Sequence, residues 1–270
     1  MTDAAFGRGL LAGKTAVITG GGSGIGRGIA LAFARAGAQL SLLGRTASKL
    51  DAVAEEARTL GVGVQTHALD VRDYDAIARA VEATAAGLGG VQILVCSAAG
   101  NFIAPAAALS ANGFKAVIDI DLLGTFNACR AAFEHLSKQG GCILSISAPQ
   151  AWVPTPLQCH AGAAKAGIAK LTQDLALEWG ASKIRVNALA PGPIDDTEGM
   201  RRLAPSDGQA RERLMAQLPA GRFGTVEEIA NVATFLCSDL ASFITGTTVV
   251  ADGGQSLIGA ATFLSLFGES

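Results

Sequence analysis

Short apolar runs alternate along this chain with longer stretches in which apolar residues recur every three or four positions. Short apolar runs are typical of buried β-strands, and the recurring pattern is typical of helices that bury one face. The runs predict seven strands, at residues 15–19, 39–43, 64–69, 91–95, 142–146, 185–189 and 247–251. The recurring pattern predicts helices over about residues 25–36, 48–60, 112–138 and 159–180, and another that ends near Ala86.

This alternation predicts an α/β fold of the Rossmann type: a doubly wound, mostly seven-stranded parallel sheet with helices on both faces. The chain has 270 residues, which suits one large domain over residues 1–270. Residues 193–218 are rich in glycine, proline, aspartate and arginine and lie between a strand end and a helix. We expect them to form a lid-like segment beside an active site.

Composition and charge narrow the choice of partners. Half of the residues are hydrophobic and 16% are charged, which predicts a sizeable core and an apolar surface suited to subunit contacts. The net charge is -2 and no long basic run occurs, so nucleic acid is not expected as a partner. The last apolar stretch, residues 257–267, is too short to span a membrane, and we expect it to pack on a neighbouring subunit.

The cysteines and the chain ends predict a cytoplasmic protein. Five cysteines are scattered along the chain without CxxC spacing, which indicates reduced thiols and no metal site. Near the start, no basic segment precedes an apolar one, so no signal peptide is expected. The last three residues, 268–270, are not a peroxisomal address.

A glycine cluster follows the first predicted strand and opens the first helix, in the segment Thr19-Gly-Gly-Gly-Ser-Gly-Ile-Gly26. In this position, missing side chains let backbone N–H groups approach a pyrophosphate, and the helix N-terminus adds donors and a favourable dipole. The cluster predicts a dinucleotide site that includes Gly20, Gly22, Ser23, Gly24 and Ile25. A tight turn without a ligand is the plainer alternative.

The end of the second strand distinguishes the two nicotinamide cofactors. An acidic residue there accepts hydrogen bonds from the ribose hydroxyls and repels a 2′-phosphate. This chain has Gly44 followed by Arg45, and a guanidinium binds phosphate strongly. The pair favours NADP(H), with Arg27 as a further source of positive charge. A solvated Arg45 is the alternative.

Further motifs occur in the order found in the short-chain dehydrogenase/reductase family, which the chain resembles over about residues 10–256. They are Asp70-Val71, Ala98-Ala-Gly100, Lys165, Pro191-Gly192 and Asp252-Gly-Gly254. The resemblance implies that Asp70 and Val71 flank the adenine, that Ala98 lies on the ribose side, and that Lys165 holds the nicotinamide ribose. It also implies that the nicotinamide is bracketed by Pro191, Gly192, Ile194 and Thr197. Members are commonly tetrameric, so we expect a homo-tetramer, with helices 112–138 and 159–180 at the interface.

The catalytic group usual in this family is incomplete here. The family uses Asn, Ser, Tyr and Lys, with Tyr four residues before Lys so that both lie on one helix face. The corresponding residues in this chain are Asp121, Ala148, Ala161 and Lys165. The single tyrosine of the chain, Tyr74, lies shortly after Asp70 on the adenine side. Chemistry that needs a phenol to protonate an alkoxide therefore lacks its proton carrier.

One branch of the family, the peroxisomal-type 2,4-dienoyl-CoA reductases, is similar to this chain at the same unusual places. The shared segments are residues 98–102, 119–121, 159–165, 190–194 and 197–199. That branch also lacks the tyrosine and has Asp in place of Asn. It has a second carboxylate one turn after the lysine, where this chain has Ala169, and a mitochondrial branch has a tyrosine where this chain has Gln150.

This resemblance implies an NADPH-dependent reductase that converts a 2,4-dienoyl-CoA to a 3-enoyl-CoA. The site must then stabilise an oxyanion and protonate the α carbon, which a water held by Asp121 and Lys165 would do. Asp121 has a structural hydrogen bond as its alternative role. His160 is expected either to donate a proton or to be a hydrogen-bonded core residue.

Asn101 and Phe102 are expected to line the acyl pocket, with a plain loop as the alternative. CoA phosphates are expected to meet arginines of the lid-like segment, unless these arginines form a solvated helix face; they are Arg201, Arg202, Arg211 and Arg213. Two other functions remain open. One is reduction of another activated alkene or a 3-ketoacyl thioester, and the other is nucleotide binding with little catalysis.

Overall fold

A computed structural model describes residues 9–195, 197, 200 and 208–258. In this part of the chain, seven strands form one parallel sheet in the order β3-β2-β1-β4-β5-β6-β7. The strands are β1 Thr15–Thr19, β2 Gln39–Gly44, β3 Val64–Ala68, β4 Ile93–Cys96, β5 Gly141–Ile146, β6 Ile184–Pro191 and β7 Thr248–Ala251. The predicted doubly wound sheet is confirmed.

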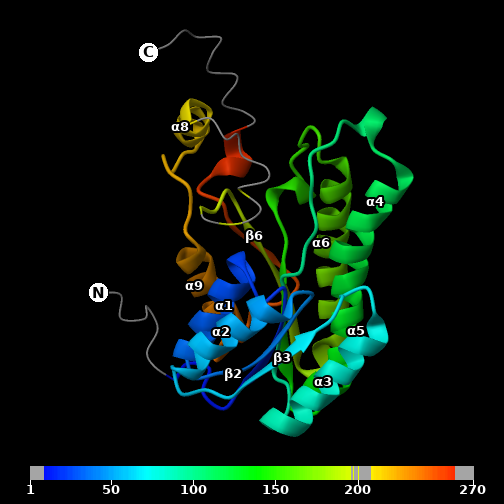
Figure 1. Ribbon diagram of the computed structural model, residues 1–270, viewed down its shortest axis with the longest axis vertical. Helices are drawn as coiled ribbons and strands as arrows, with labels where there is room; N and C mark the ends of the chain where they lie inside the picture. Colours follow the sequence, from blue (N-terminus) through cyan, green and yellow to red (C-terminus); the bar gives the residue numbers. More distant parts are fainter. Residues whose placement is uncertain (1–8, 196, 198–199, 201–207, 259–270) are drawn as a thin grey trace.

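Helices cover both faces of the sheet (Figure 1). One layer contains α1 Gly24–Arg35, α2 Ala47–Arg58 and α9 Val226–Cys237. The other contains α3 Tyr74–Leu88, α4 Ala111–Val117, α5 Gly124–Leu136 and α6 Cys159–Trp179. In Figure 1 the short helix α8, Gly208–Gln217, lies above α9 and apart from the sheet.

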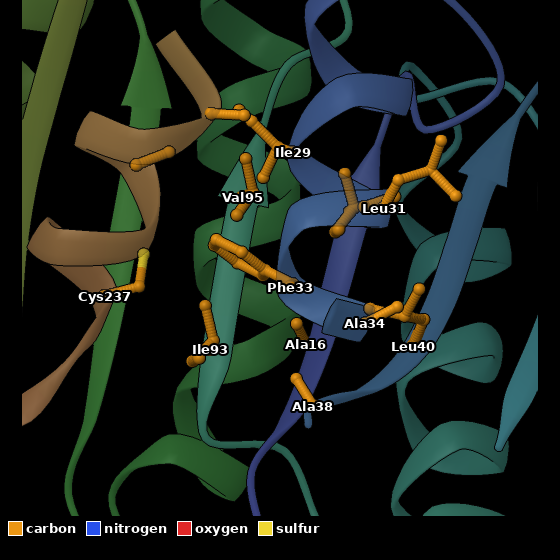
Figure 2. Packing of buried hydrophobic residues seen from close by; sticks show 14 of the residues in the cluster. Ala16, Ile29, Leu31, Phe33, Ala34, Ala38, Leu40, Ile93, Val95 and Cys237 are labelled. Carbon is orange, nitrogen blue, oxygen red and sulfur yellow. The ribbon is translucent and has the colours of Figure 1, made fainter. Parts of the chain in front are cut away.

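Strand side chains alternate between two cores, one under each helical layer. In β1, Ala16 and Ile18 belong to the core beneath α1, whereas Val17 belongs to the core beneath α3 and α5. Figure 2 shows Ile29 and Phe33 of α1 directed toward β4 in the first core. Because successive side chains of a strand point to opposite faces, a continuous apolar strand buries both sides of the sheet.

The strand order of the sheet reverses between β3 and β4. Strands β1 to β3 extend outward on one side of β1, and β4 returns to its other side. In doubly wound sheets, ligands bind in the crevice that such a reversal opens at the carboxyl ends of the strands. The loops after β1 and β4 meet here, because the Thr19 hydroxyl accepts hydrogen bonds from the N–H groups of Ser97 and Ala98, at 3.1 and 3.2 Å.

The helix predicted over residues 112–138 is interrupted by a π-helical segment, Ile118–Leu123, between α4 and α5. Hydrophobic periodicity does not reveal this change of winding. In the segment expected to be lid-like, α8 forms the C-terminal part, and residues 196, 198–199 and 201–207 lie outside the described residues. The expected packing of residues 257–267 on another subunit likewise falls almost wholly outside them. None of the described helices combines the length and the hydropathy that crossing a membrane requires.

Candidate active site

The turn between β1 and α1 is so tight that two of its glycines have no room for a side chain. A Cβ on Gly20, whose φ is +68°, would lie 2.8 Å from the backbone nitrogen of Ala98. A Cβ on Gly26 would lie 2.3 Å from the carbonyl oxygen of Gly20. Because Gly20 and Gly26 have no side chain, this turn can lie directly against the loop after β4.

The N-terminus of α1 fits a pyrophosphate. Ser23 is the N-cap, and its hydroxyl makes no capping hydrogen bond within the described residues. Gly24 has a φ of +51°, and among the described residues a Cβ there would find only Thr197, at 4.0 Å. First-turn N–H groups without a side-chain cap form a site suited to an anion. Gly22 and Ile25 belong to the same turn.

At the ribose end, the structure separates the two arginines that the sequence had grouped. Arg45 directly follows β2 and is exposed. Next to it, Thr46 is the N-cap of α2, and its hydroxyl makes no capping hydrogen bond in the described part of the chain. Arg27 instead forms an ion pair with Glu56 of α2. A carboxylate thus offsets part of the charge of Arg27, and its expected contribution to a phosphate site stays a prediction.

At the adenine position, Asp70 is tied to its neighbour Arg72. The Arg72 side chain donates to both carboxylate oxygens of Asp70, at 2.9 and 2.7 Å, and these hydrogen bonds lower the pKa of Asp70 to about 2. Val71 is buried, and its carbonyl accepts a hydrogen bond from Asn127 at 3.1 Å. Tyr74 begins α3, on the same side as Asp70.

A buried ion pair occupies the centre of the site. The Lys165 ammonium on α6 lies 3.1 Å from Oδ2 of Asp121 and donates to the carbonyl of Ile146, at the end of β5, over 3.0 Å. The other oxygen of Asp121 accepts the backbone N–H of Gly100 at 2.7 Å. Only 1% of the Asp121 side chain and 11% of the Lys165 side chain are exposed. The sequence indicated both residues, and the structure brings them into direct contact.

Neither of the two alanines of the site can replace the polar groups that the family uses. Ala161 lies on α6 one turn before Lys165 and is 3% exposed, and Ala148 immediately precedes a short 3₁₀ turn at Pro149–Ala151. A methyl group neither donates nor accepts a proton. Any proton that reaches a substrate here comes from a different group or from water.

His160 and the loop after β4 form the wall beside these alanines. His160 is fully buried, and its ring lies 4.5 Å from the ring of Phe102. Asn101 donates to the side-chain oxygen of Gln158 at 2.8 Å. Asn101, Phe102 and His160 were expected from the sequence, but Gln158 was not. Its position just before α6 was the only sequence feature that indicated a place in the site.

The residues expected at the nicotinamide lie at the end of β6. A Cβ on Gly192 would come within 2.6 Å of the Asp252 backbone, so Pro191-Gly192 lies directly against the segment after β7. Ile194 pairs with Gly224. The hydroxyl of Thr197 donates to the Ile194 carbonyl at 3.0 Å, and the Cβ of Thr197 would lie 4.0 Å from a Cβ on Gly24.

The arginines expected to meet CoA phosphates find other partners or lie outside the described residues. Arg211 forms an ion pair with Asp195 at 2.6 Å and stacks on the ring of Phe223 at 4.6 Å. Within the described chain, Arg211 therefore already has a carboxylate partner, and its expected contact with a CoA phosphate stays a prediction. Arg213 also has a partner. Arg201 and Arg202 are among the residues that the structure does not describe.

Comparison with known proteins agrees with this geometry. A family model described as enoyl-(acyl carrier protein) reductase matches residues 20–256. The peroxisomal 2,4-dienoyl-CoA reductase of Rattus norvegicus, named as (3E)-enoyl-CoA-producing, is 44% identical over 91% of this chain and 85% of its own length. A probable 2,4-dienoyl-CoA reductase of Bacillus subtilis, named as (2E)-enoyl-CoA-producing, is 43% identical over 90% of this chain and 97% of its own length.

Among solved structures, gluconate 5-dehydrogenase from Burkholderia cenocepacia in complex with NADP and tartrate is similar, with a TM-score of 0.86. It is 32% identical and covers 92% of this chain and 96% of its own. The chain belongs to the short-chain dehydrogenase/reductase family. It is an oxidoreductase that uses a nicotinamide cofactor, and the 2,4-dienoyl-CoA reductases are among its relatives at more than 40% identity.

The buried ion pair generates a stability prediction. Removing one charge of a buried pair leaves the other without compensation and typically costs about 3–5 kcal/mol. We expect Asp121→Asn and Lys165→Met each to lower the free energy of unfolding, and the double variant to lose less than the sum of the two. Urea unfolding of all four proteins gives the coupling energy, expected at about 0.5–3 kcal/mol. Strict additivity would show that the two side chains do not interact in solution.

Gly26 generates a second prediction. In Gly26→Ala the new methyl collides with backbone, so we expect a loss of about 1–3 kcal/mol in stability together with weaker binding of the cofactor. Gly180→Ala is the matched control, since a Cβ there meets nothing within 4 Å and its φ is -58°. Thermal unfolding and cofactor titration of both variants make the test. If Gly26→Ala and Gly180→Ala had equal stability and equal affinity for the cofactor, the close packing of the turn would be contradicted.

Proposed function

We propose that this protein is an NADPH-dependent reductase of conjugated acyl thioesters, which converts a 2,4-dienoyl-CoA to a 3-enoyl-CoA. The observation that carries the proposal is the buried Asp121–Lys165 pair beside Ala161. A site without a phenol at this place suits a substrate whose negative charge is delocalised, because such a substrate needs no strong acid at one localised oxygen. The relatives named as dienoyl-CoA reductases support the same substrate class.

NADPH is the proposed cofactor. Gly44 leaves the ribose position without a carboxylate, and exposed Arg45 lies at the uncapped N-terminus of α2. A 2′-phosphate there receives both a guanidinium and helix N–H donors. The pyrophosphate is assigned to the turn at residues 20–25, and the nicotinamide to the segment from Pro191 to Thr197. Ala98 and Lys165 are assigned to the ribose hydroxyls between them, and Asp70-Val71 to the adenine.

When bound, NADPH supplies a hydride to C5 of the dienoyl group. The C4=C5 electron pair then becomes C3=C4, the C2=C3 pair becomes C1=C2, and the thioester oxygen takes the negative charge. Protonation at C2 restores the thioester carbonyl and leaves the double bond at C3. One hydride and one proton are consumed, so the product is a 3-enoyl-CoA.

The chain's own groups position this chemistry. An ammonium has three N–H donors, and the described contacts of Lys165 with Ile146 and Asp121 engage two of them. The remaining donor is available to a ribose hydroxyl or a water. Each carboxylate oxygen of Asp121 has a second lone pair for that water. We assign to the pair the orientation of the water that protonates C2, and to Asn101, Phe102 and His160 the wall of the acyl pocket.

We further propose that the protein is a cytoplasmic homo-tetramer built from one domain over residues 1–270. Support comes from large apolar side chains that the described chain leaves exposed at the end of α6 and after α9. Leu177 of α6 is 86% exposed, and Phe243, after α9, is fully exposed. A tetramer with two-fold axes buries two different surfaces of each subunit. All five cysteines are free thiols, as a reducing compartment requires.

Activity tests the substrate assignment. Purified protein with NADPH is expected to oxidise the cofactor when a 2,4-dienoyl-CoA is added, as measured by loss of reduced-nicotinamide absorbance. A 3-ketoacyl-CoA is the control, and its turnover is expected to be at least about 100-fold slower, because the missing acid is worth on the order of 10²–10⁴ in rate. Brisk reduction of the ketone with none of the diene would contradict the proposal. Binding of NADPH without any turnover would indicate a nucleotide-binding protein instead.

The cofactor assignment has its own variant. Arg45→Ala is expected to weaken NADPH binding about 10- to 100-fold while leaving NADH binding nearly unchanged, since a hydrogen bond to a charged group contributes about 1.5–3 kcal/mol. Arg27→Ala is the matched control, because Glu56 already pairs with that arginine. Fluorescence titration with both cofactors measures the effect. Equal losses of affinity for NADPH and NADH would show that Arg45 does not bind the 2′-phosphate.

A further inference from the structure

Four buried polar atoms, on residues one or two positions in the chain from the two alanines of the site, have no hydrogen-bond partner within the described residues. They are Oγ of Ser147, Oε1 of Gln150, and both ring nitrogens of His160. The fifth such atom in the described chain is Nε2 of His67, on β3. Unpartnered buried atoms are therefore concentrated at the end of β5 and the start of α6.

Position in the chain connects these atoms with the catalytic centre. Ser147 follows Ile146, whose carbonyl binds Lys165. Gln150 lies in the 3₁₀ turn that packs against α6. His160 directly precedes Ala161 and lies about 100° around the helix from it. The three polar residues thus flank Ala148 and Ala161, where the family has a hydroxyl and a phenol.

Burial without a partner is costly, so native proteins fill such places with water or ligand. A neutral imidazole has one N–H donor and one acceptor nitrogen, and in His160 the protein satisfies neither. A histidine that only supports the fold normally has one nitrogen fixed by a protein group. His160 is instead held by its ring, which contacts Phe102 on the acyl side. No described residue binds either nitrogen, so each can bind a buried water molecule.

We propose that His160 is a positioning residue that relays protons to the active-site water, with Ser147 and Gln150 holding the waters on its outer side. The inference rests on the proposed reductase function. As the active-site water gives a proton to C2, one ring nitrogen of His160 donates a proton to the resulting hydroxide. The other nitrogen takes a proton from the outer water, and Gln150, only partly buried, connects that water to bulk solvent. The imidazole ends neutral with its tautomer exchanged, and the proton consumed comes from solvent.

Two substitutions of His160 test the relay with dienoyl-CoA and NADPH. His160→Ala removes the ring, and His160→Gln keeps a donor and an acceptor but cannot take a proton at one atom while giving it from another. Both are expected to lower kcat about 10- to 100-fold, within the range of acid–base groups, with KM for NADPH changed less than about two-fold. The solvent isotope effect on kcat should rise in both variants, because proton delivery becomes rate-limiting. Added imidazole should restore part of the activity of His160→Ala and none of that of His160→Gln.

His135→Gln is the matched control, because His135 lies on α5 beside Glu82 and away from the site; its kinetics should equal those of the wild type. Ser147→Ala and Gln150→Leu should each lower kcat about 3- to 10-fold, part of the effect of an acid–base group. Wild-type kcat in either His160 variant, or lost activity with an unchanged isotope effect and no imidazole rescue, would overturn the relay alone. If His160→Ala does not fold, His160→Gln decides by its kcat and isotope effect. A wild-type protein that does not oxidise NADPH with dienoyl-CoA would overturn the proposed function and the relay with it.

Discussion

The contact between Asp121 and Lys165 is the constraint on which the rest of the site depends. Two opposite charges with 1% and 11% of their side chains exposed are stable only when each is paired and hydrogen-bonded. Here each charge also has a backbone partner, the Gly100 N–H for the carboxylate and the Ile146 carbonyl for the ammonium. The pair therefore fixes the loop after β4, the end of β5 and the middle of α6 relative to one another.

The replacement of a phenol by a methyl changes which reaction this arrangement favours. A tyrosine near a lysine supplies a proton to one localised alkoxide. With Ala161 in its place, the site retains a charged pair and a buried imidazole. Water is a weak acid, so the site suits intermediates that are already stabilised by conjugation. The same fold thus suits a conjugated acceptor of hydride because a tyrosine side chain is absent, not because a new side chain is present.

Much of this could be predicted from the sequence, because the determining features are local. Short apolar runs such as residues 15–19 and 39–43 are typical of buried strands. The glycines at positions 20 and 26 are needed because a Cβ there would collide with backbone atoms. The resemblance to the short-chain dehydrogenase/reductase family also implied Asp121 and Lys165. The π-helical winding of Ile118–Leu123 was not predicted, because hydrophobic periodicity is nearly unchanged by one wider turn.

Side-chain pairing was the part that sequence reasoning could not supply. Arg27 and Arg211 each looked available to a phosphate, yet Glu56 and Asp195 neutralise them from distant positions in the chain. The sequence also does not reveal that both ring nitrogens of His160 lack a hydrogen-bond partner among the described residues. That depends on how distant segments pack around the ring.

The loop after β4 is attached at three successive places: Ser97 and Ala98 to Thr19, Gly100 to Asp121, and Asn101 to Gln158. These attachments join the turn after β1, the central charges and the residue before α6 through five consecutive residues. A ligand that orders the first attachment also reduces the freedom of the last. Such a connection favours ordered addition, in which the nucleotide enters first and the acyl thioester meets a wall that is already formed.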